Sequence, residues 1–398
     1  AGRRSAAQGD VAAASLLGRA ISLLPSGDAA VPDLRRLEAL SLVDAGRYED
    51  AEVALEAGLA AAEALGDDAM TWRLRIEQAD LQVEFRHTEL DTGAHEQLAA
   101  DAIAALQAAG DVAGLARAHR FLGDMLTWRG RQEDAAEMYV AARHHARDVG
   151  DRRELGELTT GGGAIGSLPA ERCLAVVEDA LASADRPNPN LLSSFGVVLA
   201  MLGRHEEAQR ACRDALERAT ELGAELWGAS VRMYAALAMR LAGDAPAAEQ
   251  IVRPAVESLQ GMGSKNYLSS AACLLAEALW RQGRGDEAML ATQLAEGASA
   301  PDDVAAEMGW RAARAKVLAD RGDLRSAEQL AREAARLGSE SDFLLFTGWA
   351  NEDLAHVLRR SGKYEEALAA IEAARACYVR KGAVAALARL DDVERVGA

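Results

Sequence analysis

The sequence predicts an all-α protein, a right-handed α-solenoid of about ten helical hairpins, and two observations support this prediction. The first is a repeat of turn glycines at spacings of 40, 40, 39 and 40 residues, each followed five residues later by an alanine. Periods of this size are typical of stacked hairpins, in which each unit packs only on its neighbours. The second is composition: alanine is the commonest residue, there are only 8 prolines, and aromatic residues make up 4% of the chain, which favours helix over sheet. The five glycines are Gly203, Gly243, Gly283, Gly322 and Gly362.

The last full repeat shows how one unit is built. Leu354 and Leu358 place apolar side chains on one face of a first helix, and Gly362 ends that helix without a Cβ penalty. Ala367 and Ala374 continue the apolar stripe on a second helix, where their small size permits close packing against the first. The pattern therefore predicts an antiparallel helix pair.

Residues 1–150 hold the N-terminal repeats. A hairpin is expected over 32–65, and a second over 70–109 in which a looser loop replaces the tight glycine turn. A third, over 112–149, carries Gly123 in the middle of its first helix. A glycine there costs about 1 kcal/mol relative to alanine, so we expect it to serve a close contact between helices.

The regularity lapses over 151–190, where Gly161, Gly162 and Gly163 interrupt one helix and two prolines mark a loop. The glycine run does not form a phosphate-binding loop, because no Gly-Lys-Ser/Thr follows it. Regular repeats of about 40 residues return over 191–380. A last helix over 383–396 ends on charged residues, as expected for the cap of a solenoid. The whole of 1–398 is thus expected to form a single superhelix.

Charge and cysteine usage narrow the class of protein. A formal net charge of −18 argues against a nucleic-acid-binding surface, which needs clustered lysine and arginine. The 4 cysteines lack metal-ligand spacing and favour buried free thiols in a reducing cytoplasm. No apolar run approaches the roughly 20 residues that span a bilayer, so no membrane partner is expected. The arginine-rich, lysine-poor composition indicates a bacterial source, and the sequence starts inside a helical pattern, so we expect a longer parent protein.

The repeats resemble tetratricopeptide repeats. The resemblance is carried by the apolar series from Leu354 to Ala374, by Gly-Lys-Tyr-Glu-Glu-Ala at 362–367, and by Leu122-Gly123 with Ala135. It covers most of the chain, and the period near 40 exceeds the family's usual 34-residue unit, which implies longer helices. The resemblance implies a binding scaffold.

A narrower resemblance concerns the bacterial signalling ATPases of the STAND class, in their adenylate-cyclase-associated and LuxR-type members. Ala1-Gly-Arg-Arg and Gly9-Asp10 are similar to the segment where the repeat region of those proteins begins. Asp302-Asp303-Val304 and Trp310-Arg311 are also similar to that group. The similarity implies a regulatory sensor arm whose parent carries the ATPase or effector chemistry.

No catalytic, cofactor or metal site is predicted. The adjacent His144 and His145 diverge around a helix and cannot readily share one metal, and no His-Glu-x-x-His string occurs. Carboxylate pairs such as Glu365 and Glu366 lie in the first turn of second helices, where they favour the helix dipole. We therefore expect no enzyme activity.

A candidate concave binding surface follows from helix phase. First helices are expected to line the inner side of the superhelix. Each first helix carries a small residue that faces the second helix. The residue directly after it, and the residue three positions beyond that one, point away from the second helix. Residues selected in this way, with those on the adjoining face of the first helix of the 112–149 hairpin, carry aromatic groups and charges of both signs. They are Arg117, Arg120, Asp124, Trp128, Glu277, Trp280, Lys316, Trp349, Glu352, His356 and Arg359.

This mixture suits a protein or peptide partner better than a nucleic acid, and a small-molecule effector is a further candidate ligand. The sequence thus predicts a non-catalytic sensor and protein-interaction scaffold, the regulatory arm of a signalling ATPase or transcriptional regulator. Two alternatives remain open at this point. One is a stand-alone repeat scaffold that binds a peptide or a partner protein, and the other is an enzyme fragment with an inter-repeat pocket near Gly161. The groove can also be merely solvated.

Overall fold

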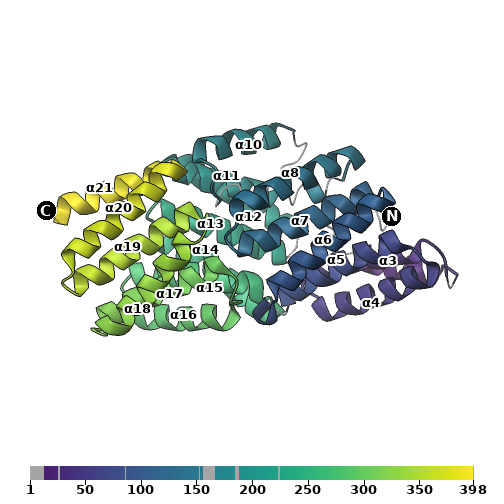
Figure 1. Cartoon of the computed structure of the whole chain (residues 1–398), viewed down its shortest axis with the longest axis horizontal. Coiled ribbons are helices and arrows are strands. Elements are labelled where there is room, and N and C mark those ends of the chain that lie inside the picture. Colours follow the sequence, from purple (N-terminus) through teal and green to yellow (C-terminus); the bar gives the residue numbers. More distant parts are fainter. Residues whose placement is uncertain are drawn as a thin grey trace.

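The computed structural model describes residues 13–397, apart from 26, 86, 152, 156–165, 184–187 and 223–224. In this part of the chain the regular elements are all helical and no strand occurs, so the predicted all-α solenoid is confirmed. Consecutive helices form hairpins that stack from the N-terminal end to the C-terminal end of an elongated body (Figure 1). The first four elements are α2 (Ala13–Ser22), which precedes the hairpins, α3 (Val31–Asp44), α4 (Tyr48–Leu65) and α5 (Asp68–Phe85).

The remaining elements follow in chain order. They are η1 (His87–Glu89), α6 (Thr92–Ala109), α7 (Val112–Trp128), α8 (Gln132–Val149), α10 (Ala170–Ser183), α11 (Pro189–Met201), α12 (His205–Leu222), α13 (Glu225–Leu241), α14 (Ala245–Met262), α15 (Lys265–Arg281), α16 (Gly285–Ala298), α17 (Val304–Asp320), α18 (Leu324–Ser339), α19 (Leu344–Arg360), α20 (Tyr364–Lys381) and α21 (Val384–Gly397). Eight hairpins are described in full, and α21 occupies the position of the predicted capping helix. The irregularity predicted at Gly161 to Gly163 lies outside the described residues.

The turn glycines end the first helices as predicted. Each of the five has a positive φ, between 74° and 88°, the left-handed conformation that L side chains avoid. The backbone N–H of Gly283 donates to the carbonyl oxygen of Trp280, and the N–H of Arg284 donates to the carbonyl oxygen of Leu279. The carbonyls at the end of α15 are thereby satisfied inside the turn.

Gly283→Ala should lower the free energy of unfolding by about 1 kcal/mol, because the added Cβ would be strained at a φ of 75°. No other atom lies within 4 Å of the Cβ position, so the effect isolates the backbone. Gly261→Ala is the matched control: it lies inside α14, also with open space around the Cβ position. That variant should gain up to about 1 kcal/mol from helix propensity. If urea denaturation shows that both substitutions change the free energy of unfolding in the same direction, the turn at Gly283 has been assigned wrongly.

Gly123 serves the close helix contact that the sequence predicts. A Cβ on Gly123 would lie 2.7 Å from a ring carbon of Tyr139, so only glycine lets α7 approach the tyrosine of α8. Gly348 meets Tyr378 in the same way between α19 and α20. In both hairpins the absence of a side chain on the first helix makes room for a buried ring on the second.

The solenoid coils back on itself, and contacts join hairpins far apart in the chain. The helix α5 packs against α15, and α3 packs against α13. Asn266 donates to Glu84 at 2.7 Å, Thr92 donates to Asp302 at 2.6 Å, and the N–H of Asp342 donates to the carbonyl of Gly130 at 2.8 Å. We call these contacts the inter-turn seam. The two side-chain bonds join residues 182 and 210 positions apart, so about five 40-residue units make one superhelical turn.

The apolar core differs between the two halves of the chain. From Ala170 to Leu390 one large cluster of buried side chains runs through the hairpins, with small clusters beside it, whereas the hairpins before it hold only smaller clusters among the described residues. Among the described residues, no helix has the length and apolarity needed to cross a membrane.

Candidate functional site

The first helices enclose a cavity of about 400 Å³, which we call the lumen. Its walls come mainly from α3, α5 and α7 on one side and from α13, α15, α17 and α19 on the other, with Tyr139 of α8 and Asn190 of α11 also in the lining. The predicted role of first helices as the inner lining therefore matches the lining of this cavity. The seam brings the two sets of helices face to face, so the lumen is bounded by residues nearly two hundred positions apart.

The wall formed by α3, α5 and α7, with Arg153 and Glu154 beyond α8, is charged. Arg117 lies at its centre, where its Nε donates to Glu77 at 3.1 Å and its Nη2 donates to Asp80 at 2.6 Å. Arg36 reaches the other oxygen of Glu77 at 3.3 Å. Burial alone would raise the pKa of Glu77, but the surrounding guanidinium groups of Arg117 and Arg36 hold it below its ordinary value. Glu77 is therefore a carboxylate between two arginines.

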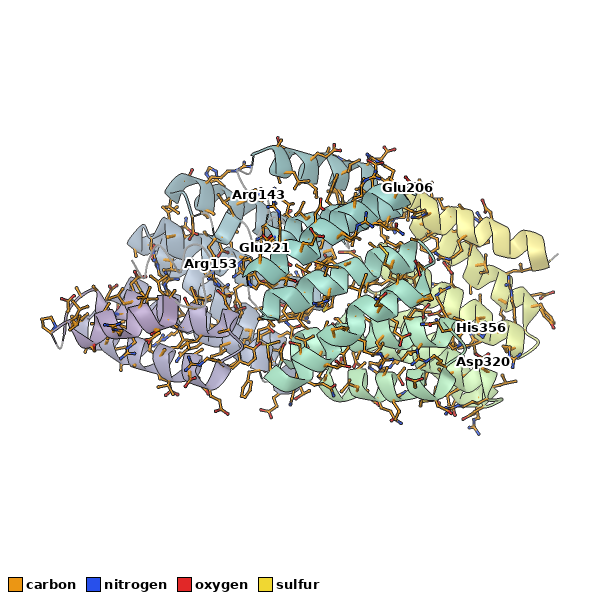
Figure 2. All side chains as sticks on the ribbon, turned by 180° about the vertical axis from the view of Figure 1, so that it is seen from behind. Arg143, Arg153, Glu206, Glu221, Asp320 and His356 are labelled. Carbon is orange, nitrogen blue, oxygen red and sulfur yellow. The ribbon has the colours of Figure 1, made fainter. Side chains whose placement is uncertain are left out.

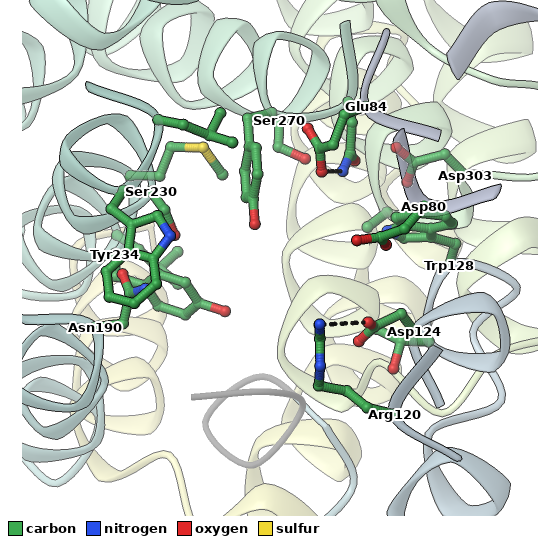
Figure 3. Close-up of a pocket in the computed structure, with 18 of the residues that line it drawn as sticks. Asp80, Glu84, Arg120, Asp124, Trp128, Asn190, Ser230, Tyr234, Ser270 and Asp303 are labelled. Atoms are coloured by element: carbon green, nitrogen blue, oxygen red, sulfur yellow. Dashed lines mark hydrogen bonds and ion pairs between the residues drawn. The ribbon is translucent and has the colours of Figure 1, made fainter. Parts of the chain in front are cut away.

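Two other carboxyl groups on this wall have a raised pKa instead of a lowered one. Burial raises the pKa of Glu84 to about 8, helped by the nearby charge of Asp80. Glu84 accepts hydrogen bonds from Asn266 at 2.7 Å and Ser264 at 3.3 Å, and it has no ion-pair partner in the described part of the chain. Burial also raises the pKa of Asp124 to about 6, although Arg120 lies 3.2 Å away. Figure 3 shows Asp80, Glu84 and Asp124 together on one side of the lumen.

The starting point of α7 fixes this charged wall. Asp111 caps the helix by accepting the N–H of Gly114 at 3.1 Å, and Arg73 of α5 binds the same carboxylate. The cap and the ion pair together hold α5 and α7 in register, so that Asp80 and Arg117 meet.

The opposite wall is mainly apolar and aromatic. Arg240 lies over the ring of Trp349 at 3.7 Å from its centroid, a cation-π contact. Phe346 stacks on the same tryptophan at 5.5 Å between centroids. The larger side chains of this wall are Leu226, Trp227, Met233, Tyr234, Leu237, Tyr267, Leu274, Met308, Phe343, Phe346 and Trp349.

A buried ion network lies behind the aromatic wall. Lys316 has no exposed surface, and its Nζ binds Glu277 and lies 2.9 Å from Asp353. Burial raises the pKa of Asp353 to about 6, whereas the cations around Glu277, Arg240 and Lys316 foremost, hold its pKa well below the ordinary value. Lys316 also lies 4.0 Å from the centroid of the Trp280 ring. This lysine is a structural cation, shielded from solvent.

The structure divides the residues predicted for the concave surface into two groups. Six of them line the lumen: Arg117, Arg120, Asp124, Trp128, Glu277 and Trp349. The other five lie outside its lining: Trp280, Lys316, Glu352, His356 and Arg359.

Several residues outside the lumen lining form a separate cluster between α15, α17 and α19. Trp280 donates to Asp320 at 2.8 Å and packs edge-on against His356 at 5.3 Å between centroids. His356 in turn lies 3.4 Å from Asp320 (Figure 2). Glu352 is engaged elsewhere, since it accepts from Tyr378 and from Arg389 at 2.8 Å.

Three buried polar atoms that belong to lumen-lining residues have no hydrogen-bond partner among the described residues. They are Nη1 of Arg117, Oδ1 of Asn190 and Nε of Arg240. Both side chains are largely buried, since Arg117 is 7% exposed and Asn190 is 5% exposed. A buried polar atom without a partner costs about 1–3 kcal/mol, and a ligand that supplies the missing partner would recover that cost.

The lumen lining offers groups suited to recognition, namely guanidinium groups, carboxyl groups and aromatic rings. Within the described ranges, no three histidine, cysteine, aspartate or glutamate side chains are grouped so as to hold a metal ion. Cys273 lines the lumen, but burial raises the pKa of its thiol, which opposes formation of a nucleophilic thiolate.

No protein-family model matches the sequence. No curated protein matches it either. Among solved structures, the chain is similar to a Rap protein complexed with the Competence and Sporulation Factor, with a TM-score of 0.66 and 15% identity over 90% of this chain and 100% of that one. It is also similar to the APC/C hetero-tetramer Cut9-Hcn1, with a TM-score of 0.51 and 12% identity over 94% of this chain and 81% of that one. These likenesses show the fold, a solenoid of the tetratricopeptide-repeat type.

Proposed function

We propose that this chain is a non-catalytic receptor whose lumen binds a peptide segment of its partner, and that it serves as the sensor arm of a larger regulator. The observation that carries the proposal is the lumen itself, a cavity of about 400 Å³ with one charged and one aromatic wall. Its lining also holds buried polar atoms that have no hydrogen-bond partner within the described part of the chain. A peptide supplies both donors and acceptors along its backbone as well as apolar side chains. It can therefore meet both walls at once.

The comparison with solved structures supports the same class of function. The Rap protein of this fold was solved in complex with the Competence and Sporulation Factor, so a solenoid of this type binds a partner in that case. The resemblance of the first residues and of 302–311 to STAND-class ATPases supports a parent that carries the effector chemistry. The net charge of −18 weighs against a nucleic-acid ligand.

Selection from a randomised octapeptide library tests this function. We expect the full chain to enrich a family of related sequences, and we expect Ser270→Trp to lose them, because Ser270 lines the lumen and an indole there would fill it. Ser339→Trp is the matched control, since Ser339 is exposed at the end of α18. It should bind the same peptides as the unmodified chain.

Two outcomes would overturn the proposal. One is the absence of any enriched sequence. The other is equal binding of the enriched peptides to the Ser270→Trp chain, which would place their site outside the lumen. Circular dichroism on both variants establishes that they retain the helical fold.

A further inference from the structure

Three carboxyl groups gather on the charged wall of the lumen, and we call them the acidic pole: Asp80 and Glu84, one turn apart on α5, and Asp124 on the adjacent α7. Figure 3 shows all three on the same side of the cavity. Like charges that share a poorly hydrated site repel one another, and such a group is stabilised by a cation placed among them.

The cations of this wall do not neutralise the acidic pole. Arg117 divides its guanidinium between Glu77 and Asp80, and Arg120 divides its own between Asp124 and the buried Glu154. In the described ranges, the hydrogen-bond partners of Glu84 are the neutral amide of Asn266 and the hydroxyl of Ser264. Among the ion pairs of the described residues, these two arginines thus meet Glu77, Asp80, Asp124 and Glu154, and Arg36 also meets Glu77.

A second observation, independent of the carboxyl groups, comes from the lining on the other side. The side chain of Asn190 is 5% exposed, and its Oδ1 has no donor among the described residues. Figure 3 places Asn190 across the lumen from Arg120 and Asp124. An orphaned acceptor opposite a set of carboxylates calls for an occupant rich in N–H donors.

The lumen also lacks acceptors for some of its own donors. Nη1 of Arg117 and Nε of Arg240 are both buried without partners in the described chain. A free polyamine offers no acceptor for them, whereas each residue of a peptide carries a carbonyl oxygen. The combination of unmet carboxylates with unmet guanidinium N–H groups distinguishes a peptide from a simple organic cation.

We propose that the acidic pole binds the ammonium or guanidinium group of a basic residue in a peptide ligand, while carbonyl oxygens of that peptide accept from Arg117 and Arg240. This inference rests on the proposed function and specifies the ligand of the same lumen. The apolar wall around Tyr234 and Trp349 contacts the neighbouring apolar residues of the peptide. Glu84 binds the cation in its ionised form, and because burial raises its pKa to about 8, binding near pH 7 releases a proton.

The experiment uses peptides enriched from the octapeptide library, with the full chain as the receptor. We expect lysine or arginine at one fixed position of the enriched sequences. Replacement of that arginine by citrulline, its neutral isostere, should weaken binding by about 10- to 100-fold, as expected for hydrogen bonds to charged groups. Glu84→Gln and Asp80→Asn should each remove most of the difference in affinity between the arginine and the citrulline peptide, because each amide keeps the shape of the side chain without its charge. Glu206→Gln, on an exposed carboxylate of α12, should leave it unchanged.

The outcomes separate this inference from the proposed function. If no peptide is enriched, the proposed function fails. If peptides bind in the lumen but citrulline serves as well as arginine, the acidic pole has been assigned wrongly while the receptor function stands. If spermidine binds as tightly as the selected peptide, the ligand of the acidic pole is a free polyamine and its assignment as a peptide is wrong.

The role of Glu84 is tested by calorimetry at pH 7 in two buffers of different ionisation enthalpy. It should report proton release on peptide binding for the unmodified chain and much less for Glu84→Gln. Equal values for both would overturn the role of Glu84.

Discussion

Replacement of Lys316 by methionine should lower the free energy of unfolding by about 3–5 kcal/mol, the loss expected when one partner of a buried ion pair is removed. Lys316 has no exposed surface and lies between Glu277 and Asp353. Without it, Asp353 loses its nearest cation among the described residues, and Glu277 still pairs with Arg240 and Arg281. Chemical denaturation followed by circular dichroism measures the loss.

Lys363→Met provides the control for this result. Lys363 also pairs with a glutamate, Glu328 at 2.7 Å, but its side chain is 42% exposed. Exposed pairs contribute about 0–1 kcal/mol, so the same substitution should have little effect there. The loss at Lys316 should also be smaller at pH 5 than at pH 8, because a protonated Asp353 no longer needs the cation. A loss below about 1 kcal/mol at pH 8 would show that the lysine is hydrated rather than enclosed.

Glu84→Gln should stabilise the protein at alkaline pH, by an amount on the order of a few kcal/mol. Burial raises the pKa of Glu84 from 4.5 to about 8, so between these values the folded state binds more protons than the unfolded state. The contribution of Glu84 to stability is therefore greatest at low pH and declines as the pH rises from about 4.5 to about 8. The glutamine stays neutral and can still accept the hydrogen bond from Asn266.

The difference between the two chains is the quantity to measure, because Asp124 and Asp353 titrate in an overlapping range. Urea denaturation at pH 5, 6, 7 and 8 should show the advantage of Glu84→Gln growing with pH. Glu206→Gln, whose side chain is 92% exposed, should show no such growth. A constant difference across the series would mean that Glu84 is ionised throughout.

The local features of the fold could be predicted from the sequence because they depend on neighbouring residues. A positive φ at Gly283 follows from the need to end a helix within one turn, and the place of Gly123 against Tyr139 follows from the cost of glycine inside a helix. Helix phase similarly led to Arg117 and Asp124 in the lumen lining. The same offset applied to Ala79 and Ala236 would have selected Asp80, Leu237 and Arg240, which sequence reasoning missed.

The remaining part of the site depends on the superhelical pitch, which the repeat period does not contain. Whether successive turns touch is decided by small rotations between hairpins, added over about five units. Without the pitch, nothing in the sequence indicates that Glu84 meets Asn266 or that Asn190 faces the same cavity as Asp124. Helix phase also could not show that Lys316 is covered by Trp280 and paired on two sides.

The inter-turn seam changes how this solenoid should fold. In an open array each unit contacts only its two neighbours, so structure can propagate from any point and unravel from either end. Here the contacts of Glu84, Thr92 and Gly130 require partners about 180 to 210 residues away, which raises the contact order far above that of local hairpins. Closure of such long loops carries an entropic cost that local helices do not offset. Hairpins are therefore expected to form first and the lumen last, so that a ligand site exists only once both ends of the array have been made and joined.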